Sequence, residues 1–259
     1  MSATPPRGRL FLVPTPLDHG CDVQAPLGDV LPQGTLVQAA AITHWISENA
    51  RSARAFLKRV DALQPLAQPI QAQQITELPR EVHKKGDHQP SGTWDARPLL
   101  APALQGHDMG LVSEAGMPAV ADPGSSVVRA AHALGVEVVP LVGPVSLLLA
   151  LAASGLNGQD FAFTGYLSQD SAERVRQIHD LGRTVQKTGQ TRILIETPYR
   201  NQALLAALVA GLEPSLRLAV ATHLTLPPAR TRCASVAEWR RNAMTVDNKV
   251  PAVFLVGRG

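Results

Sequence analysis

The hydrophobic positions of this chain fall into short apolar runs that alternate with stretches of helical spacing. Leu10–Val13, Met109–Val112 and Val136–Leu141 are apolar runs that predict strands, because strands at the centre of a parallel sheet are covered on both faces. Ser125–Leu134 and Val145–Ser154 have helical lengths and spacing, and a glycine follows each of them, as is common where a helix ends. Residues 109–154 therefore predict a β-loop-α-β-loop-α unit with right-handed crossovers.

The second half of the chain repeats this alternation after a polar, glycine-containing break at residues 154–160. Strands are predicted at Phe161–Tyr166, Arg192–Glu196, Leu216–Ala221 and Ala252–Val256, and helices at Ser171–Lys187, Arg200–Ala210 and Val236–Asn242. The pattern predicts an α/β fold with two α/β domains in series, an N-terminal domain at 1–157 and a C-terminal domain at 158–259.

Residues 45–61 carry apolar side chains at spacings near three and four, which predicts an amphipathic helix. The other face of this helix bears four basic residues, Arg51, Arg54, Lys58 and Arg59. Two interpretations stay open for them, a solvated helix face and a patch for an anionic substrate.

Residues 79–98 are polar and without a clear period, which predicts a loop with short structured pieces. Long loops of this kind are often lids over a site, and a plain surface insertion fits the same pattern.

Composition and cysteine content narrow the class of protein. The chain has 259 residues, of which 45% are hydrophobic, enough to bury a sizeable core. Its net charge of +3 permits an RNA partner without requiring one. Cys21 and Cys233 have no paired spacing, which favours a reducing, cytoplasmic compartment and argues against disulfides and a zinc site. We expect no metal ion.

The longest apolar stretch, Val138–Leu156, contains a proline and a Gly-Pro pair between residues 140 and 144. A membrane-spanning helix needs about 20 uninterrupted apolar residues, so a strand, a turn and a buried helix are expected instead. The first residues also lack the apolar run of a signal peptide. We expect a soluble protein with no membrane partner.

Several common catalytic and nucleotide-binding motifs are missing from the sequence. GxxxxGK[ST] does not occur, nor does GxGxxG after the first strand, which disfavours NTPases, ordinary dehydrogenases and the common Rossmann-type methyltransferases. HExxH, CxxC and GxSxG are also absent, which removes support for zinc proteases, thiol redox enzymes and α/β-hydrolases.

Rigid loops rich in glycine and proline stand at three predicted strand ends instead. They have the sequences VPTPLDHG, VSEAGMPAVADPG and LVGPVS. Gly116, Gly124 and Gly143 allow a ligand close to the backbone, while the prolines hold the loops in place. Ligands on parallel sheets bind at the carboxyl ends of the strands, where these loops are expected. Such loops suit an adenosine and an amino-acid tail better than a phosphate group.

These three segments and the closing PAVFLVG resemble the tetrapyrrole-methylase superfamily of S-adenosylmethionine-dependent enzymes, in one order over nearly the whole chain. Within it they are most similar to the bacterial 16S rRNA ribose 2′-O-methyltransferases. The resemblance implies a two-domain α/β fold, an S-adenosyl-L-methionine site in the cleft between the domains, and a homodimer.

The resemblance also implies which residues contact the cofactor. They are Pro16, Leu17, Ala115, Gly116, Met117, Val120, Val145, Ser146, Glu196, either His223 or Leu224, Pro251 and Ala252. Asp122 follows the second loop. Two interpretations stay open for Asp122 and Glu114: each carboxylate either caps a glycine-rich turn or takes part in catalysis.

The segments expected to face the substrate depart from the pattern of the rRNA enzymes. Where those enzymes have Glu-Asp-Thr-Arg, this chain has Glu48-Asn49-Ala50-Arg51, and their Lys-Gly-Glu near the end becomes Lys249-Val250-Pro251. The resemblance therefore implies a divergent branch.

A ribose hydroxyl is a weak nucleophile that benefits from a base or from a cation near the developing alkoxide. The candidates for these catalytic roles are Glu48, Arg51, Glu114 and Arg200, with Glu196, His19 and His223 as further options. For Arg200, a phosphate contact and a salt bridge to Glu196 are both open.

Three functions stay open at this point: 2′-O-methylation of a ribose in rRNA with the small ribosomal subunit as partner, methylation of a small molecule such as a tetrapyrrole, and S-adenosylmethionine binding without catalysis.

Overall fold

The computed structural model describes residues 6–79, 94–242 and 244–259. Contacts divide the chain into two compact units, Met1–His19 with Ala25–Pro144 and Gly20–Gln24 with Val145–Gly259. Most of the predicted loop at 79–98, including any lid it forms, lies outside the described residues, so its role stays a prediction.

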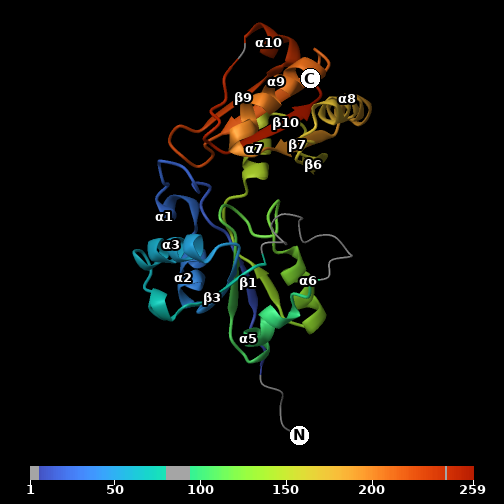
Figure 1. Cartoon of the computed structure of the whole chain (residues 1–259). Helices are drawn as coiled ribbons and strands as arrows, with labels where there is room; N and C mark the ends of the chain where they lie inside the picture. Colours follow the sequence, from blue (N-terminus) through green and yellow to red (C-terminus); the bar gives the residue numbers. More distant parts are fainter. Residues whose placement is uncertain (1–5, 80–93, 243) are drawn as a thin grey trace. The chain divides into compact units, whose positions relative to one another are not determined.

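The first unit is built on a five-stranded parallel sheet (Figure 1). Its strands are β1 (Leu10–Val13), β2 (His44–Ser47), β3 (Gln74–Glu77), β4 (Met109–Val112) and β5 (Val138–Pro140), in the order β3-β2-β4-β1-β5. Val112 at the end of β4 is paired with Val13 of β1 on one side and with Ser47 of β2 on the other. Because all pairings are parallel, the carboxyl ends of the strands lie at one edge of the sheet.

Helices cover both faces of this sheet (Figure 1). On one face lie α1 (Leu27–Val30), α2 (Gln33–Ala41) and α3 (Ala50–Asp61), with the 3-10 helix η1 (Ile70–Ala72); on the other lie α5 (Ala101–Leu104) and α6 (Ser125–Leu134), with η2 (Arg97–Leu100). Leu10 and Phe11 are neighbours in β1, and they belong to the hydrophobic clusters on opposite faces of the sheet. Both faces of the sheet are therefore covered by apolar side chains, as the continuous apolar runs predict.

The strand order creates a topological switch point between β1 and β4. The connection from β1 to β2 crosses one face of the sheet, and the connection from β4 to β5 crosses the other. The loops that follow β1 and β4 therefore start at neighbouring strand ends and lead to opposite faces. Open α/β sheets bind their ligands at such a point.

The second unit has a mixed five-stranded sheet in the order β6-β7-β10-β8-β9. Its strands are β6 (Phe161–Gly165), β7 (Thr191–Ile195), β8 (Arg217–Thr222), β9 (Arg230–Ser235) and β10 (Ala252–Gly257), and only β6 and β7 pair in parallel. Three helices, α8 (Ser171–Thr188), α9 (Asn201–Gly211) and α10 (Val236–Arg241), pack on this sheet through one hydrophobic cluster. Helix α7 (Ser146–Ser154) packs on it through another. The 3-10 helix η3 (Pro198–Arg200) precedes α9.

The α/β class with two sheets is confirmed, and each predicted strand exists within one or two residues of its expected bounds. Strand β9, strand β3 and the short helices α1 and α2 were not predicted. The division by contacts differs from the predicted boundary at 157 in two places. It assigns α7 to the second unit, where Leu147 and Leu151 pack with the strands, and it also assigns Gly20–Gln24 to that unit.

The prediction of a single helix over 45–61 is wrong at its start. His44–Ser47 is strand β2, and α3 begins only at Ala50. The Asn49 side chain caps α3 by accepting hydrogen bonds from the backbone N–H of Arg51 at 2.8 Å and of Ser52 at 3.4 Å. Trp45 and Ile46 match helical spacing, but they point to opposite faces of the sheet.

The apolar stretch at 138–156 contains β5, a loop and α7. None of the helices in the described part of the chain is both long and apolar enough to cross a membrane.

Gly110 of β4 gives a test of the packing in the first unit. A Cβ atom there would lie 2.4 Å from Cζ3 of Trp45, whose indole N–H donates to Gln73 Oε1 at 3.0 Å and is thereby held in place. We expect Gly110→Ala to lower the free energy of unfolding by about 1–3 kcal/mol through overpacking, as measured by urea denaturation. Gly34→Ala is the matched control, because its Cβ would meet nothing within 4 Å in α2. An equal loss in both variants would contradict this account.

Candidate functional site

The loops after β1 and β4 are joined by a pair of backbone hydrogen bonds. The N–H of Thr15 donates to the carbonyl of Gly116 at 2.9 Å, and the N–H of Gly116 donates to the carbonyl of Thr15 at 3.1 Å. The hydroxyl of Thr15 also donates to the carbonyl of Ser113 at 3.2 Å. Two of the expected cofactor segments, 16–17 and 115–117, are thereby held together at the switch point.

The third loop of the first unit reaches the same place. A Cβ atom on Gly143 would lie 2.3 Å from Cγ of Pro14, so only glycine allows this approach. A Cβ on Gly116 would lie 3.2 Å from Cδ2 of Leu17 and 3.6 Å from the carbonyl oxygen of Pro144. The contact between the loops therefore requires glycine at position 143, while at position 116 the φ of 81° favours glycine.

The loop from 117 to 124 is held in a strained conformation. Ala119 and Ala121 both have φ of 64°, in the left-handed region that costs non-glycine residues about 1–2 kcal/mol each. Strain of this kind clusters at functional sites. Val120, a residue expected to contact the cofactor, lies between them and is 42% exposed.

Carboxylates gather beside these loops. The pKa of Asp122 is raised to about 7, mainly because the carboxyl group is buried and also because of the negative charges of Glu48 and Glu114. Ser113 has the opposite effect and lowers this pKa. Glu114 also lies 3.5 Å from Nε2 of His19. The electrostatic environment therefore favours a positively charged ligand.

Glu48 and Arg51, two of the predicted catalytic residues, follow the end of β2. The hydroxyl of Ser47, the last residue of β2, is buried without a hydrogen-bond partner among the described residues. Arg51 is in the first turn of α3 with its side chain exposed. The carboxylate of Glu77 accepts from the N–H of Ala50 at 2.6 Å, so the start of α3 is already capped.

In the second unit, Glu196 and Arg200 form an ion pair of 3.1 Å. The salt bridge considered from the sequence is therefore present. Oε1 of Glu196 also accepts from the backbone N–H of Thr197 at 2.8 Å. This carboxylate is buried at the end of β7 and is held in one orientation.

The other predicted residues of this unit meet at the same edge of its sheet. Ala252 begins β10 and is paired with Thr222 at the end of β8, and the next pair along β10 is Val253 with Ile195, the residue before Glu196. Leu224 and Val145 pack in the cluster that covers this face, and Ser146 begins α7 there. Pro251 precedes Ala252 and is exposed.

The turn after β8 is strained in the same way as the loop after β4. His223 and Thr225 have φ of 53° and 69°. The hydroxyl of Thr225 is buried without a hydrogen-bond partner in the described part of the chain. Each unit thus has a strained loop at the sheet edge that carries its predicted residues.

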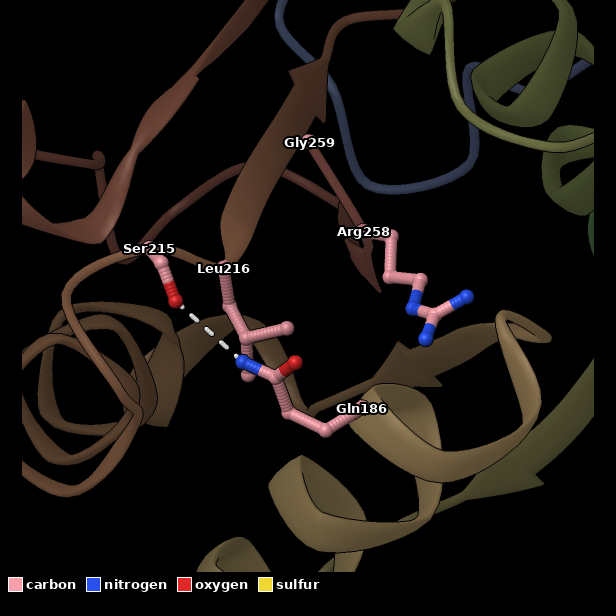
Figure 2. A pocket seen from close by; sticks show the side chains of 5 residues that line it. All are labelled: Gln186, Ser215, Leu216, Arg258 and Gly259. Carbon is pink, nitrogen blue, oxygen red and sulfur yellow. Dashed lines mark hydrogen bonds between the residues drawn. The ribbon is translucent and has the colours of Figure 1, made fainter.

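The second unit has a pocket of about 330 Å³. It is lined by Gln186, Ser215, Leu216, Arg258 and Gly259 (Figure 2). It contains none of the predicted residues. Arg217 at the start of β8 is paired with Gly257 at the end of β10, so the pocket lies at the opposite end of these strands. Over the described ranges, no group of three or more His, Cys, Asp or Glu residues has a geometry that could hold a metal ion.

Sequence reasoning missed two parts of this arrangement. The helix predicted over 45–61 hid the position of Glu48 at a strand end, although the Asn49 cap before a long helix was a signal for the true boundary. The proximity of Asp122 to Glu48 and to Glu114 had no signal in the sequence, because the position of Glu48 depends on the strand order.

Comparisons with known proteins agree with this architecture. The family model described as "Tetrapyrrole (Corrin/Porphyrin) Methylases" matches residues 36–238. Ribosomal RNA small subunit methyltransferase I of Escherichia coli O157:H7 is 30% identical over 86% of this chain and 68% of its own length. The protein of the same name from Synechocystis sp. is 32% identical over 84% of this chain and 67% of its own. The Pseudomonas aeruginosa protein of that name is 31% identical over 74% of this chain and 58% of its own.

A solved structure shares the fold. The methyltransferase CobJ is superposed with a TM-score of 0.55 and 20% sequence identity, over 97% of this chain and 95% of its own. At that level of identity the likeness concerns the fold alone. The family match, the relatives and the two α/β units together show that the chain belongs to the tetrapyrrole (corrin/porphyrin) methylases, a family of methyltransferases.

Proposed function

We propose that this chain transfers a methyl group from S-adenosyl-L-methionine to the 2′-hydroxyl of a ribose in the rRNA of the small ribosomal subunit, in the cytoplasm. The observation that carries the proposal is the joining of the Thr15 and Gly116 loops at the switch point, in a family of methyltransferases. The rRNA is proposed because the relatives are named ribosomal RNA small subunit methyltransferases.

The charges beside the loops fit this cofactor. S-adenosylmethionine carries a sulfonium and an ammonium group, and a cation is attracted by the carboxylates of Glu48, Glu114 and Asp122. The loops offer close backbone groups and no phosphate cradle, which suits the adenosine and amino-acid parts. We propose that the twelve predicted contact residues bind the cofactor. Leu224 is the proposed contact where the sequence offered either His223 or Leu224.

The bound cofactor would supply an electrophilic methyl group. The attacking 2′-oxygen has to lose its proton and to be held in line with the methyl carbon and the sulfur. Glu48 and Glu114 are the proposed proton acceptors, since both lie on strand-end loops of the first unit. Arg51 and Arg200 are the proposed cations for the developing alkoxide or a neighbouring phosphate. For Arg200 this role requires its ion pair with Glu196 to be shared or broken.

We also propose a homodimer, which an exposed apolar surface of the second unit supports. Phe161 and Phe163 of the edge strand β6 are both 41% exposed. Phe163 is paired with Ile193, a member of the cluster under α7, so both phenylalanines belong to the face that α7 covers. Leu148 on α7 is also exposed. Apolar surface of this kind often marks a protein interface.

Binding of S-adenosylmethionine, measured by calorimetry, tests the common premise. We expect binding by the wild-type chain and at least about tenfold weaker binding by Gly116→Val, because a β-branched residue is strained at φ of 81° and its Cβ approaches Leu17. Gly158→Ala is the control, since its Cβ would meet nothing within 4 Å. Absence of binding by a folded wild-type chain would refute the proposed cofactor.

The pH dependence of cofactor affinity tests the carboxylate group. A bound cation favours ionised Asp122, whose pKa is about 7 in the free protein. We therefore expect affinity to rise about tenfold between about pH 6 and about pH 8, with proton release on binding. Asp122→Asn should flatten this profile while keeping the side-chain shape.

Stability of the free protein gives an independent check on Asp122. Burial raises the pKa of Asp122 from the ordinary carboxyl value of 3.8 to about 7, so the stability that its protonated form contributes is fully present below the ordinary value and is lost as pH rises through about 7. Asp122→Asn should therefore be more stabilising at about pH 8 than at about pH 5. If the pH profiles of affinity and of stability were the same for the wild type and for Asp122→Asn, Asp122 would not titrate as stated.

The acceptor is tested by mapping 2′-O-methylation in small-subunit rRNA from a strain that lacks the gene. We expect one ribose methyl group to be missing, and to return when purified protein, S-adenosylmethionine and subunits from that strain are combined. An unchanged methylation pattern would reject rRNA as the acceptor. Methylation of a tetrapyrrole such as uroporphyrinogen by the purified protein would then support the small-molecule alternative.

A further inference from the structure

Helix α3 carries four basic side chains, and among the described residues one of them, Arg59, is paired with a carboxylate. Arg59 is half-buried, and its two terminal nitrogens donate to the carboxylate of Asp18 at 3.1 and 2.9 Å. The same guanidinium donates to the carbonyl of Ala25 at 2.6 Å, while the N–H of Ala25 donates back to Asp18 at 3.0 Å. Arg59 thus fixes the two ends of the loop between residues 18 and 25.

The other three basic residues, Arg51, Arg54 and Lys58, form what we call the α3 stripe. All three are exposed, and they follow one another at helical spacings of three and four on one side of α3. The opposite side is buried through Phe56 and Leu57. The stripe is therefore a continuous row of cations on a helix that is fixed to the sheet.

No acidic side chain is seen to neutralise the stripe within the described residues. None of the three forms one of the ion pairs found there, and α3 itself contains no carboxylate before Asp61, which accepts from the N–H of Leu66 at 3.1 Å. The basic residues of α8 differ, because Arg176 and Arg183 are each paired with a carboxylate three residues earlier.

The stripe also begins beside the candidate site. Arg51 follows Glu48 by three residues, at the carboxyl end of β2, and the row then runs away from that edge along α3. The span from 51 to 58 is about 10 Å at about 1.5 Å per residue, which is long enough to meet successive phosphates of one strand. A small anion would need a pocket, whereas a straight exposed row suits a polyanion.

We propose that the α3 stripe binds the phosphate backbone of the RNA strand whose ribose is methylated, a proposal that rests on the function proposed above. The stripe guides the strand toward the strand-end loops without reading its bases, because phosphate contacts position a nucleic acid and carry no sequence information. Specificity for the ribose is then left to the loops.

The salt dependence of RNA binding tests this surface. The probe is a fluorescent, mixed-sequence, single-stranded RNA of about 20 nucleotides, a length chosen to cover several phosphates. Each phosphate neutralised on a single strand contributes about −0.7 to the slope of log affinity against log salt. For Arg51→Gln/Arg54→Gln/Lys58→Gln we expect the slope to become shallower by about 2, and the affinity at about 0.1 M KCl to fall about 100-fold.

The matched control is Arg176→Gln/Arg183→Gln/Lys187→Gln, which removes the same charge from exposed positions of α8. We expect it to keep the wild-type slope. Equal losses in the two variants would overturn the proposal, since they would show a general effect of net charge. Circular dichroism and thermal melting should show both variants folded, because glutamine is a good helix former.

The outcomes separate this proposal from the proposed function. If the wild type binds RNA steeply and the α3 variant binds equally well, the stripe is wrong and the rRNA function stands. If the wild type binds S-adenosylmethionine but not this RNA or small ribosomal subunits, both the stripe and the rRNA acceptor are refuted, while the methyl donor remains. Preference of the stripe for an acidic protein over RNA would also overturn it.

Discussion

The parallel register of β1, β4 and β2 is the constraint on which the candidate site of the first unit depends. Because Val13, Val112 and Ser47 are aligned at the ends of their strands, the loops that follow them all start at one edge of the sheet. The strand order then sends the loops after β1 and β4 in opposite directions. The backbone pair between Thr15 and Gly116 joins them again at a single point. A shift of either strand by one residue would separate the loops and turn buried side chains to the wrong face.

The glycines at this edge act through steric fit as well as through flexibility. A Cβ atom on Gly143 would overlap with the ring of Pro14, so a side chain there would push the loops apart, whereas at Gly116 the φ of 81° is the main constraint and Leu17 is a close neighbour. The prolines have the complementary effect, since they limit the conformations that the loops can adopt. The left-handed Ala119 and Ala121 show that the surrounding contacts are strong enough to hold strained backbone. The conformation of these loops is therefore restricted by their own contacts.

The charges of the first unit are divided between the strand-end loops and the outer side of α3. Glu48, Glu114 and Asp122 lie near the loops, and burial, together with the negative charges of Glu48 and Glu114, raises the pKa of Asp122. The α3 stripe places positive charge on the exterior, starting next to the same strand end. A cationic methyl donor and a polyanionic acceptor would be attracted to different parts of this surface. Arg59, on the same helix, shows the contrasting case in which a basic residue stabilises the fold by pairing with Asp18.

The sequence by itself determined the α/β class, most of the regular elements and the three loops that carry the family resemblance. It could do so because burial on two faces gives continuous apolar runs, and because glycine and proline mark the turns locally. It did not determine where α3 begins, since Trp45 and Ile46 fit a helical spacing as well as a strand. Only the tertiary structure decided that Glu48 stands at a strand end near Asp122, and that α7 packs with the second sheet. It also decided that Arg59 is held by Asp18 while Arg51, Arg54 and Lys58 stay exposed. These facts depend on strand order and on contacts between residues far apart in the chain, which no local pattern of hydrophobic and polar residues records.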